Sequence, residues 1–341
     1  LSAADGPDMA ERFIAARQAI RKSLGDKGLT RLVDPFDPNA YNQNATIGEN
    51  LLFGVPVGDR LSPGNLASDS YCRAILQAEA LVEPLVDIGL RIAETTIDIF
   101  KDLPPGHPLF ERYALIRTDE MDDFQRLVEA AHTRDTRMRL SSVGRHKLIS
   151  LALSYIEPRH RLGLVSPAFA ARVIRARQSL RAHLPGEYAP AVEFYDPGQI
   201  MSAASVRDNL LFGRISFGQM NAEQRVWEVV RQTVRHLGLE QVIFEIGLDY
   251  EVGPGGKLLF SQQRSAINLA RCLIKRPEIL ILDGALATFG AAEAQKLLAR
   301  IRGSMAGRSL IVTVSDPSET QGYDCVLAFD GVRLLQAQPS G

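Results

Sequence analysis

The chain repeats part of itself, and any fold proposed for it has to account for the repeat. Residues 195–213 (YDPGQIMSAASVRDNLLFG) match residues 36–54 (FDPNAYNQNATIGENLLFG) without a gap, and eight of the nineteen positions are identical. Two shorter matches flank this one at nearly the same separation of 158 to 160 residues: 172–184 with 12–24, and 243–248 with 85–90. Because three collinear matches keep almost one separation, a tandem duplication is the simplest explanation.

A fourth and weaker match, between residues 140–158 and 259–277, is separated by only 119 residues. The fall from 158 to 119 implies roughly 39 additional residues in the first repeat, around 91–139. We therefore predict two domains. The first, 1–165, is a degenerate and mainly helical repeat that carries this insertion, and the second, 166–341, is the better preserved repeat.

The pattern of apolar residues predicts many helices and fewer strands. Seven segments have helical periodicity: 10–24, 72–100, 118–134, 167–184, 222–237, 261–275 and 291–304. Ser166-Pro167 is expected to start the fourth of these helices. Three apolar runs rich in β-branched residues predict strands: 278–283, 309–316 and 325–336, the last with an Asp330-Gly331 hairpin signal. Strand and helix alternate in the second repeat, which is typical of a layered α/β domain with a parallel sheet.

The composition is that of an ordinary globular protein. Of the 341 residues 45% are hydrophobic and the formal net charge is −1, so the overall charge does not favour binding to nucleic acid. Three scattered cysteines form no CxxC pair, which argues against a zinc site and for a reducing compartment. No apolar run reaches the roughly 18 residues that a membrane span needs, so we expect no direct membrane insertion.

The second repeat carries an ordered series of motifs that resembles the ATPase domain of ABC transporters. The segments are SVRDNLLFG (205–213), LLFSQQRSAINLARCLIKRPEILILDG (258–284), SLIVTVSDPSE (309–319) and the terminal FDGVRLL. The first three resemble the segment after the family's Q-loop, the signature motif LSGGQ running into the Walker B strand, and the H-loop strand. The resemblance covers about 140 residues. It implies an ABC ATPase-like α/β fold, related to P-loop NTPases, with large helical portions.

The residues that hydrolyse ATP in this family are altered at almost every position, so no catalytic residue is predicted. The chain contains no Walker A sequence, G-x-x-x-x-G-K-[ST], and its nearest imitation, GPGGK at 253–257, is expected to be a turn. Asp283 matches the Walker B aspartate, which would either hold magnesium through water or cap the loop after its strand. The resemblance places Gly284 at the catalytic glutamate, Gly290 at the D-loop aspartate and Ser315 at the switch histidine.

The signature motif and the Q-loop are altered as well. The signature-like, nucleotide-binding candidates are Ser261, Gln262 and Gln263. In the family this motif lets a helix N-terminus approach a phosphate, whose negative charge suits the free N–H groups there. Phe260 now replaces a hydroxyl donor, and Ser261 is expected to cap the helix. Pro197 aligns with the Q-loop glutamine, and Gln199 could replace that glutamine only with a two-residue slip.

These losses predict a degenerate ABC-type ATPase module that does not hydrolyse ATP and serves as a structural or regulatory part of an ABC transporter. Weak or no binding of ATP and magnesium is expected from this chain alone. The expected partners are a transporter's transmembrane domain, a second ATPase domain or both, which would hold the chain at the cytoplasmic face of the membrane. Two alternatives stay open: the C-terminal fragment of a working ABC ATPase whose Walker A lies upstream of Leu1, and a free-standing scaffold that has lost nucleotide binding.

Overall fold

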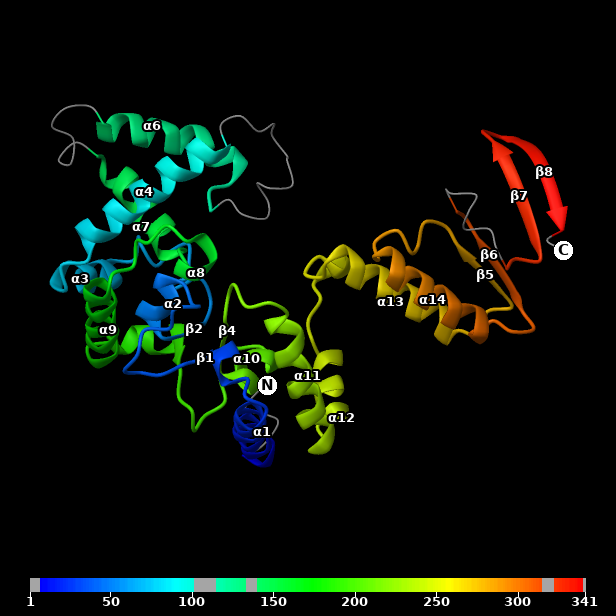
Figure 1. Cartoon of the computed structure of the whole chain (residues 1–341), viewed down its shortest axis with the longest axis horizontal. Helices are drawn as coiled ribbons and strands as arrows, with labels where there is room; N and C mark the ends of the chain where they lie inside the picture. The colour runs from blue at the N-terminus through cyan, green and yellow to red at the C-terminus, as the bar shows by residue number, and fades with distance from the viewer. Residues whose placement is uncertain (1–6, 101–114, 133–139, 315–321, 340–341) are drawn as a thin grey trace. The chain divides into compact units, whose positions relative to one another are not determined.

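The computed structural model describes residues 7–100, 115–132, 140–314 and 322–339. The chain forms two compact units, Leu1–Leu248 and Asp249–Gly341 (Figure 1). The elements of the first unit are, in order, α1 (Pro7–Asp26), η2 (Thr30–Leu32), β1 (Val33–Pro35), α2 (Ile47–Leu52), β2 (Gly54–Pro56), α3 (Ser70–Ala78), α4 (Val82–Phe100), η3 (Thr118–Glu120), α6 (Met121–His132), α7 (Ser142–Leu153), α8 (Glu157–His160), α9 (Pro167–Ala182), η4 (Gly186–Ala191), β3 (Val192–Phe194), α10 (Val206–Leu211), β4 (Gly213–Ile215), α11 (Ala222–His236) and α12 (Glu240–Leu248).

The two sequence repeats exchange elements within the first unit. Helix α1 of the first repeat packs on α10 and α11 of the second, while α9 of the second packs on α2 and α3 of the first. The short strands also pair between the repeats. Strand β1 pairs with β4 and β2 pairs with β3, and both pairs are antiparallel. The predicted boundary at 165/166 follows the sequence repeat. The compact units instead divide at 248/249, because the exchanged packing places residues of both repeats in each apolar cluster of the first unit.

Four aromatic side chains from equivalent positions meet between the exchanged strands. Phe36 and Tyr195 stack with ring centroids 3.9 Å apart and planes inclined by only 7°. Phe53 and Phe212 approach this stack edge-on, at centroid distances of 5.3 to 6.3 Å. Both of these phenylalanines end a short helix in the left-handed conformation, with φ of 47° and 46°. The same residue types therefore surround the stack in an approximately two-fold arrangement.

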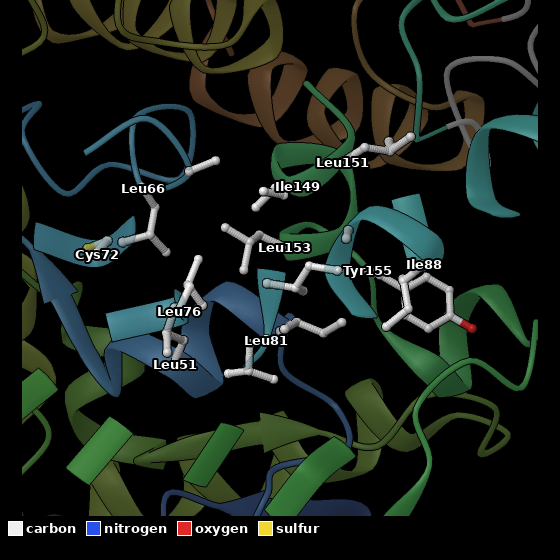
Figure 2. Close-up of a cluster of buried hydrophobic side chains, with 14 of the residues drawn as sticks. Leu51, Leu66, Cys72, Leu76, Leu81, Ile88, Ile149, Leu151, Leu153 and Tyr155 are labelled. Atoms are coloured by element: carbon white, nitrogen blue, oxygen red, sulfur yellow. The ribbon is translucent and has the colours of Figure 1, made fainter. Parts of the chain in front are cut away.

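The largest apolar core of the first unit is shared by α3, α4, α7 and α9, and its side chains interdigitate (Figure 2). Leu76, Leu81 and Tyr155 are among its fully buried members. Helices α4 and α7 cross closely at Gly89, where an added Cβ would lie 2.1 Å from the carbonyl oxygen of Leu148. Glycine is required there because any side chain would separate the two backbones.

Most of the predicted helices are confirmed, with one clear exception. The predicted helix 72–100 is two helices, α3 and α4, because the chain turns at 79–81 and Ala80 adopts a left-handed φ of 52°. The predicted start at Ser166-Pro167 is confirmed, since Ser166 Oγ accepts a hydrogen bond from the Phe169 N–H at 3.2 Å. The helices α2, α7, α8, α10 and α12 lie outside the segments predicted as helical.

The second unit is built around one parallel pair of strands. Its elements are η5 (Pro254–Gly256), α13 (Ser261–Ile274), β5 (Ile279–Leu282), α14 (Ala291–Ser304), β6 (Ser309–Val312), β7 (Cys325–Asp330) and β8 (Arg333–Pro339). Strands β5 and β6 are adjacent and parallel, as predicted, and α13 and α14 lie side by side against them (Figure 1). The buried contacts come from Leu269, Leu280, Leu282, Ile301 and Met305.

The predicted C-terminal hairpin is confirmed, because β7 and β8 pair antiparallel and Gly331 supplies the left-handed turn residue with φ of 56°. A broad layered parallel sheet was expected from the alternation of strands and helices. Over the residues that the structure describes, each sheet instead contains two strands. No helix in the described part of the chain is long and apolar enough to cross a membrane.

Candidate functional site

The Walker B-like aspartate lies at the end of β5, where Thr313 holds the following loop. Asp283 is exposed, and its Oδ1 accepts a hydrogen bond from the Thr313 hydroxyl at 2.8 Å. The backbone N–H of Thr313 donates to the Leu282 carbonyl at 3.0 Å, and the N–H of Gly284 donates to Thr313 Oγ1 at 3.2 Å. Thr313 therefore joins the ends of β5 and β6. These are the contacts of an aspartate that closes the loop after its strand.

Gly284 and Gly290, which follow Asp283 in the sequence, carry no side chain. Gly284 adopts a left-handed φ of 55°, and an added Cβ would meet nothing within 4 Å. A side chain at this position would have space but would carry backbone strain of roughly 1–2 kcal/mol. Gly290 is the N-cap of α14, and its carbonyl accepts hydrogen bonds from the Glu293 and Ala294 N–H groups at 2.9 Å each. Ser315 lies outside the described residues, so its match to the switch histidine stays a prediction.

The signature-like residues lie in the first turn of α13. The prediction that Ser261 caps this helix is wrong, because Phe260 occupies the N-cap position with extended backbone (φ −64°, ψ 157°). The side chain of Gln263 makes this earlier start favourable, since its Oε1 accepts a hydrogen bond from the Phe260 N–H at 2.9 Å. Gln262 Nε2 donates to Glu293 Oε2 at 3.0 Å and joins the first turns of α13 and α14.

The N-terminus of α13 is poorly suited to a phosphate. Gln262, in the first turn of this helix, already donates a hydrogen bond to the carboxylate of Glu293. This negative charge would repel a phosphate at the same helix end. The side chain of Phe260 is 79% exposed at the same helix end, where the family's motif has a hydroxyl. In the described part of the chain, no group of three or more His, Cys, Asp or Glu side chains is placed to hold a metal ion. Asp283 would give magnesium one contact through water, and this ion depends on substrate phosphates for most of the rest.

The GPGGK segment forms a turn, as predicted. Gly253, Gly255 and Gly256 all have positive φ, between 64° and 72°, and the Gly256 N–H donates to the Gly253 carbonyl at 3.0 Å. The following Lys257 is exposed. Helix α13 begins only at Ser261, so the turn does not lead directly into a helix N-terminus as a phosphate-binding loop does.

Gln199, the Q-loop-like candidate, belongs to the first unit, whereas the signature-like and Walker B-like residues belong to the second. It follows β3, and its side chain is exposed. Its backbone carbonyl accepts a hydrogen bond from Arg17 Nη2 at 3.0 Å. In this structure Gln199 is therefore part of a loop that an arginine of the other repeat holds in place.

Arg17 joins the two repeats and was missed by the predictions from the sequence. Its side chain is buried and donates five hydrogen bonds across the repeat boundary, all to oxygens of residues 196–209. The shortest joins Nη1 to the Pro197 carbonyl at 2.7 Å, and Nε donates to the Asn209 carbonyl at 2.9 Å. Its guanidinium also lies 4.3 Å from the ring centroid of Phe212. Burial lowers the pKa of Arg17, while Asp196 acts in the opposite direction.

Arg177 of the second repeat makes the equivalent set of contacts with the first repeat. It is 3% exposed and donates five hydrogen bonds to the first repeat, including 2.7 Å from Nε to the Asn50 carbonyl and 3.1 Å from Nη1 to the Asp37 carbonyl. Its guanidinium lies 4.2 Å from the Phe53 ring. Burial lowers the pKa of Arg177 to about 10, so the side chain keeps its charge at neutral pH. The signal in the sequence was the shared Arg-Gln-x-x-Arg of residues 17–21 and 177–181.

Part of this chain is similar to known ATP-binding proteins of transporters. It is 30% identical over 129 residues to an export ATP-binding/permease protein of Rickettsia bellii, which covers 37% of this chain and 22% of that protein. It is 26% identical over 132 residues to a multidrug resistance ABC transporter ATP-binding/permease protein of Bacillus subtilis, covering 39% of this chain and 22% of that protein. The human mitochondrial potassium channel ATP-binding subunit is 25% identical over 146 residues, covering 43% of this chain and 19% of that protein.

The chain thus spans about a fifth of the length of these relatives. No family model and no solved structure matches it. The resemblance inferred from the motifs is nevertheless shown by these relatives, whose names place them among ABC exporters and ATP-binding subunits. The chain carries a region related to the ATPases of ABC transporters.

Proposed function

We propose that this chain is a non-hydrolysing module of an ABC transporter, in which the ATPase-related second repeat has a structural or regulatory role. Its partners in this proposal are the transmembrane domain of an exporter, a second ATPase domain or both. The names of the relatives, ATP-binding/permease proteins, support a role beside a membrane-embedded permease. Binding of ATP and magnesium would then be weak, and location at the cytoplasmic face of the membrane would come from the partner.

The observation that carries the proposal is the state of the loop after β5. In the family this loop presents a carboxylate that polarises the attacking water. Here Gly284 has no side chain and a left-handed φ of 55°, and Asp283 accepts a hydrogen bond from Thr313 at 2.8 Å. Phosphoryl transfer depends on positioning and charge stabilisation that act together. A loop whose one carboxylate is engaged by Thr313, at the end of the neighbouring strand, supplies neither.

Restoring the missing side chains tests this proposal. We expect Gly284→Glu combined with Ser315→His to release phosphate from ATP at the background rate, because groups that act as a unit are strongly non-additive. The glutamate would also force a non-glycine residue into the left-handed conformation, which costs roughly 1–2 kcal/mol of stability. The measurement is phosphate release with and without magnesium, beside thermal unfolding to confirm that the variant is folded. Magnesium-dependent turnover by the restored variant would contradict the proposal.

A further inference from the structure

Two grooves in the first unit are lined by equivalent residues of the two repeats. The groove on α1 has a volume of about 230 Å³, and Phe212 and Pro197 form part of its apolar wall. Arg17, Gln18 and Arg21 line it from the helix. The inner arginine, Arg17, donates all its hydrogen bonds to backbone and amide oxygens of the other repeat. The outer residues Gln18 and Arg21 are exposed.

The groove on α9 repeats this construction with a volume of about 340 Å³. Phe53 and Pro38 stand where the first groove has its phenylalanine and proline. Arg177 is again the buried inner arginine, and Gln178 and Arg181 are again exposed on the helix. The guanidinium of Arg181 lies 5.2 Å from the ring centroid of Phe194, so it is held over the apolar wall.

The two repeats share the exposed polar residues of α1 and α9 that line the grooves. At other exposed positions of these helices the two repeats differ. Gln18 and Arg21 equal Gln178 and Arg181, although solvent-exposed side chains are not needed for packing. By contrast, the diverged exposed pairs are Asp8 with Ala168, Glu11 with Ala171, Ala15 with Arg175, and Lys22 with Ala182. Packing explains the shared inner arginine, phenylalanine and proline. It does not explain the shared glutamine. The ring contact of Arg181 with Phe194 does not explain the shared outer arginine either, because Pro35 stands at the equivalent position in the groove beside Arg21.

The charge of the grooves indicates what they bind. Each groove is lined by two arginines, and neither is lined by an aspartate or a glutamate. Asp196 and Asp37, which act electrostatically on Arg17 and Arg177, lie outside the lining, and each accepts a hydrogen bond through Oδ1 from a neighbouring backbone N–H at 2.8 Å. The net charge of the whole chain is −1, so the positive charge is a local property of the grooves. A groove with arginines beside an apolar wall is complementary to an anion with an apolar body.

We propose that each groove binds a monoanionic amphiphile, such as a medium-chain fatty acid. This binding is separate from the proposed role of the ATPase-related repeat. The carboxylate is held by the outer arginine and the neighbouring glutamine, Arg21 with Gln18 in one groove and Arg181 with Gln178 in the other. The inner arginine adds positive charge, because its donors are already engaged. The apolar chain lies against the phenylalanine and proline wall. A guanidinium matches a carboxylate geometrically, which gives the site its preference for this head group.

Calorimetric titration of the full chain with decanoate, below its micelle concentration, tests the proposal. We expect saturable binding of two decanoate molecules per chain. Decanol, which has the same apolar body and no charge, should bind about tenfold more weakly, because a hydrogen bond to a charged group contributes more than one to a neutral group. Equal binding of the two probes, or no saturable decanoate binding up to about 1 mM, would overturn the proposal.

Substitutions on the two helices locate the sites. Arg21→Gln and Arg181→Gln should each reduce the stoichiometry to one, and the double variant should bind no decanoate. Lys22→Gln and Arg175→Gln remove the same charge from exposed positions of α1 and α9 that do not line the grooves, and should leave two sites. All four residues are exposed, so the variants are expected to fold, and thermal unfolding checks this. A double variant that still binds two decanoates would show that binding occurs elsewhere.

Discussion

Replacing Arg177 with methionine is expected to lower the free energy of unfolding of the first unit by about 3–5 kcal/mol. The reason is the loss of five hydrogen bonds from one buried cation. Methionine fills much of the space but donates none of them. The carbonyl oxygens of Asp37, Pro38, Ala40 and Asn50 would keep their desolvation cost without a partner. Arg17→Met should cost a similar amount, because Arg17 makes the equivalent contacts.

Urea unfolding followed by the fluorescence of Trp227, the single tryptophan, measures this loss in the unit that contains the arginines. Arg175→Met is the matched control, since Arg175 lies on the same helix, is exposed and pairs with Glu79 at 3.5 Å. A partly exposed pair, in which 58% of the Arg175 side chain is in contact with solvent, contributes about 1 kcal/mol. If Arg177→Met and Arg175→Met had the same effect, the two arginines would not hold the repeats together as described.

The second large effect is expected at Gly89. Alanine at this position would place a Cβ 2.1 Å from the Leu148 carbonyl oxygen, which belongs to the backbone of α7 and cannot rotate away. Helices α4 and α7 would have to separate, and overpacking of this kind typically costs 1–3 kcal/mol or more. We expect Gly89→Ala to lower the free energy of unfolding by about 3 kcal/mol. Chemical denaturation of the variant measures this.

The repeat supplies a control for the same substitution. Gly247 on α12 is the sequence equivalent of Gly89, and an added Cβ there would meet nothing within 4 Å. Because alanine favours a helix over glycine by up to about 1 kcal/mol, Gly247→Ala should be neutral or slightly stabilising. Comparable destabilisation by the two substitutions would mean that the close crossing of α4 and α7 does not determine the effect.

The strands of the second unit could be predicted because their signal is local. Residues 278–283 and 309–316 are short apolar runs rich in β-branched residues, and their parallel pairing followed from the helix between them. The break between α3 and α4 was missed because no glycine marks it and Ala80 takes the left-handed conformation instead. Pro84, in the first turn of α4, was the available sign that a helix starts there.

The exchange of elements between repeats could not be predicted from the sequence. The match of residues 172–184 with 12–24 shows that the two helices are equivalent, but it does not say which repeat each helix packs against. That choice is made by long-range contacts, such as those of Arg17 with residues about 180 to 192 positions away. Ser261 is a different case, because the contact that moved the helix start by one residue is local and joins Gln263 to the Phe260 N–H three positions earlier.

Steady-state phosphate release from ATP by the purified, unmodified chain, with and without magnesium, tests the central claim most directly. The account predicts the background rate in both conditions, because Asp283 is engaged by Thr313 and no carboxylate occupies position 284. Asp283→Ala should leave that rate unchanged, which distinguishes a trace contaminant from activity of this chain. Magnesium-dependent turnover that is lost in Asp283→Ala would contradict the account and assign ATP hydrolysis to this chain.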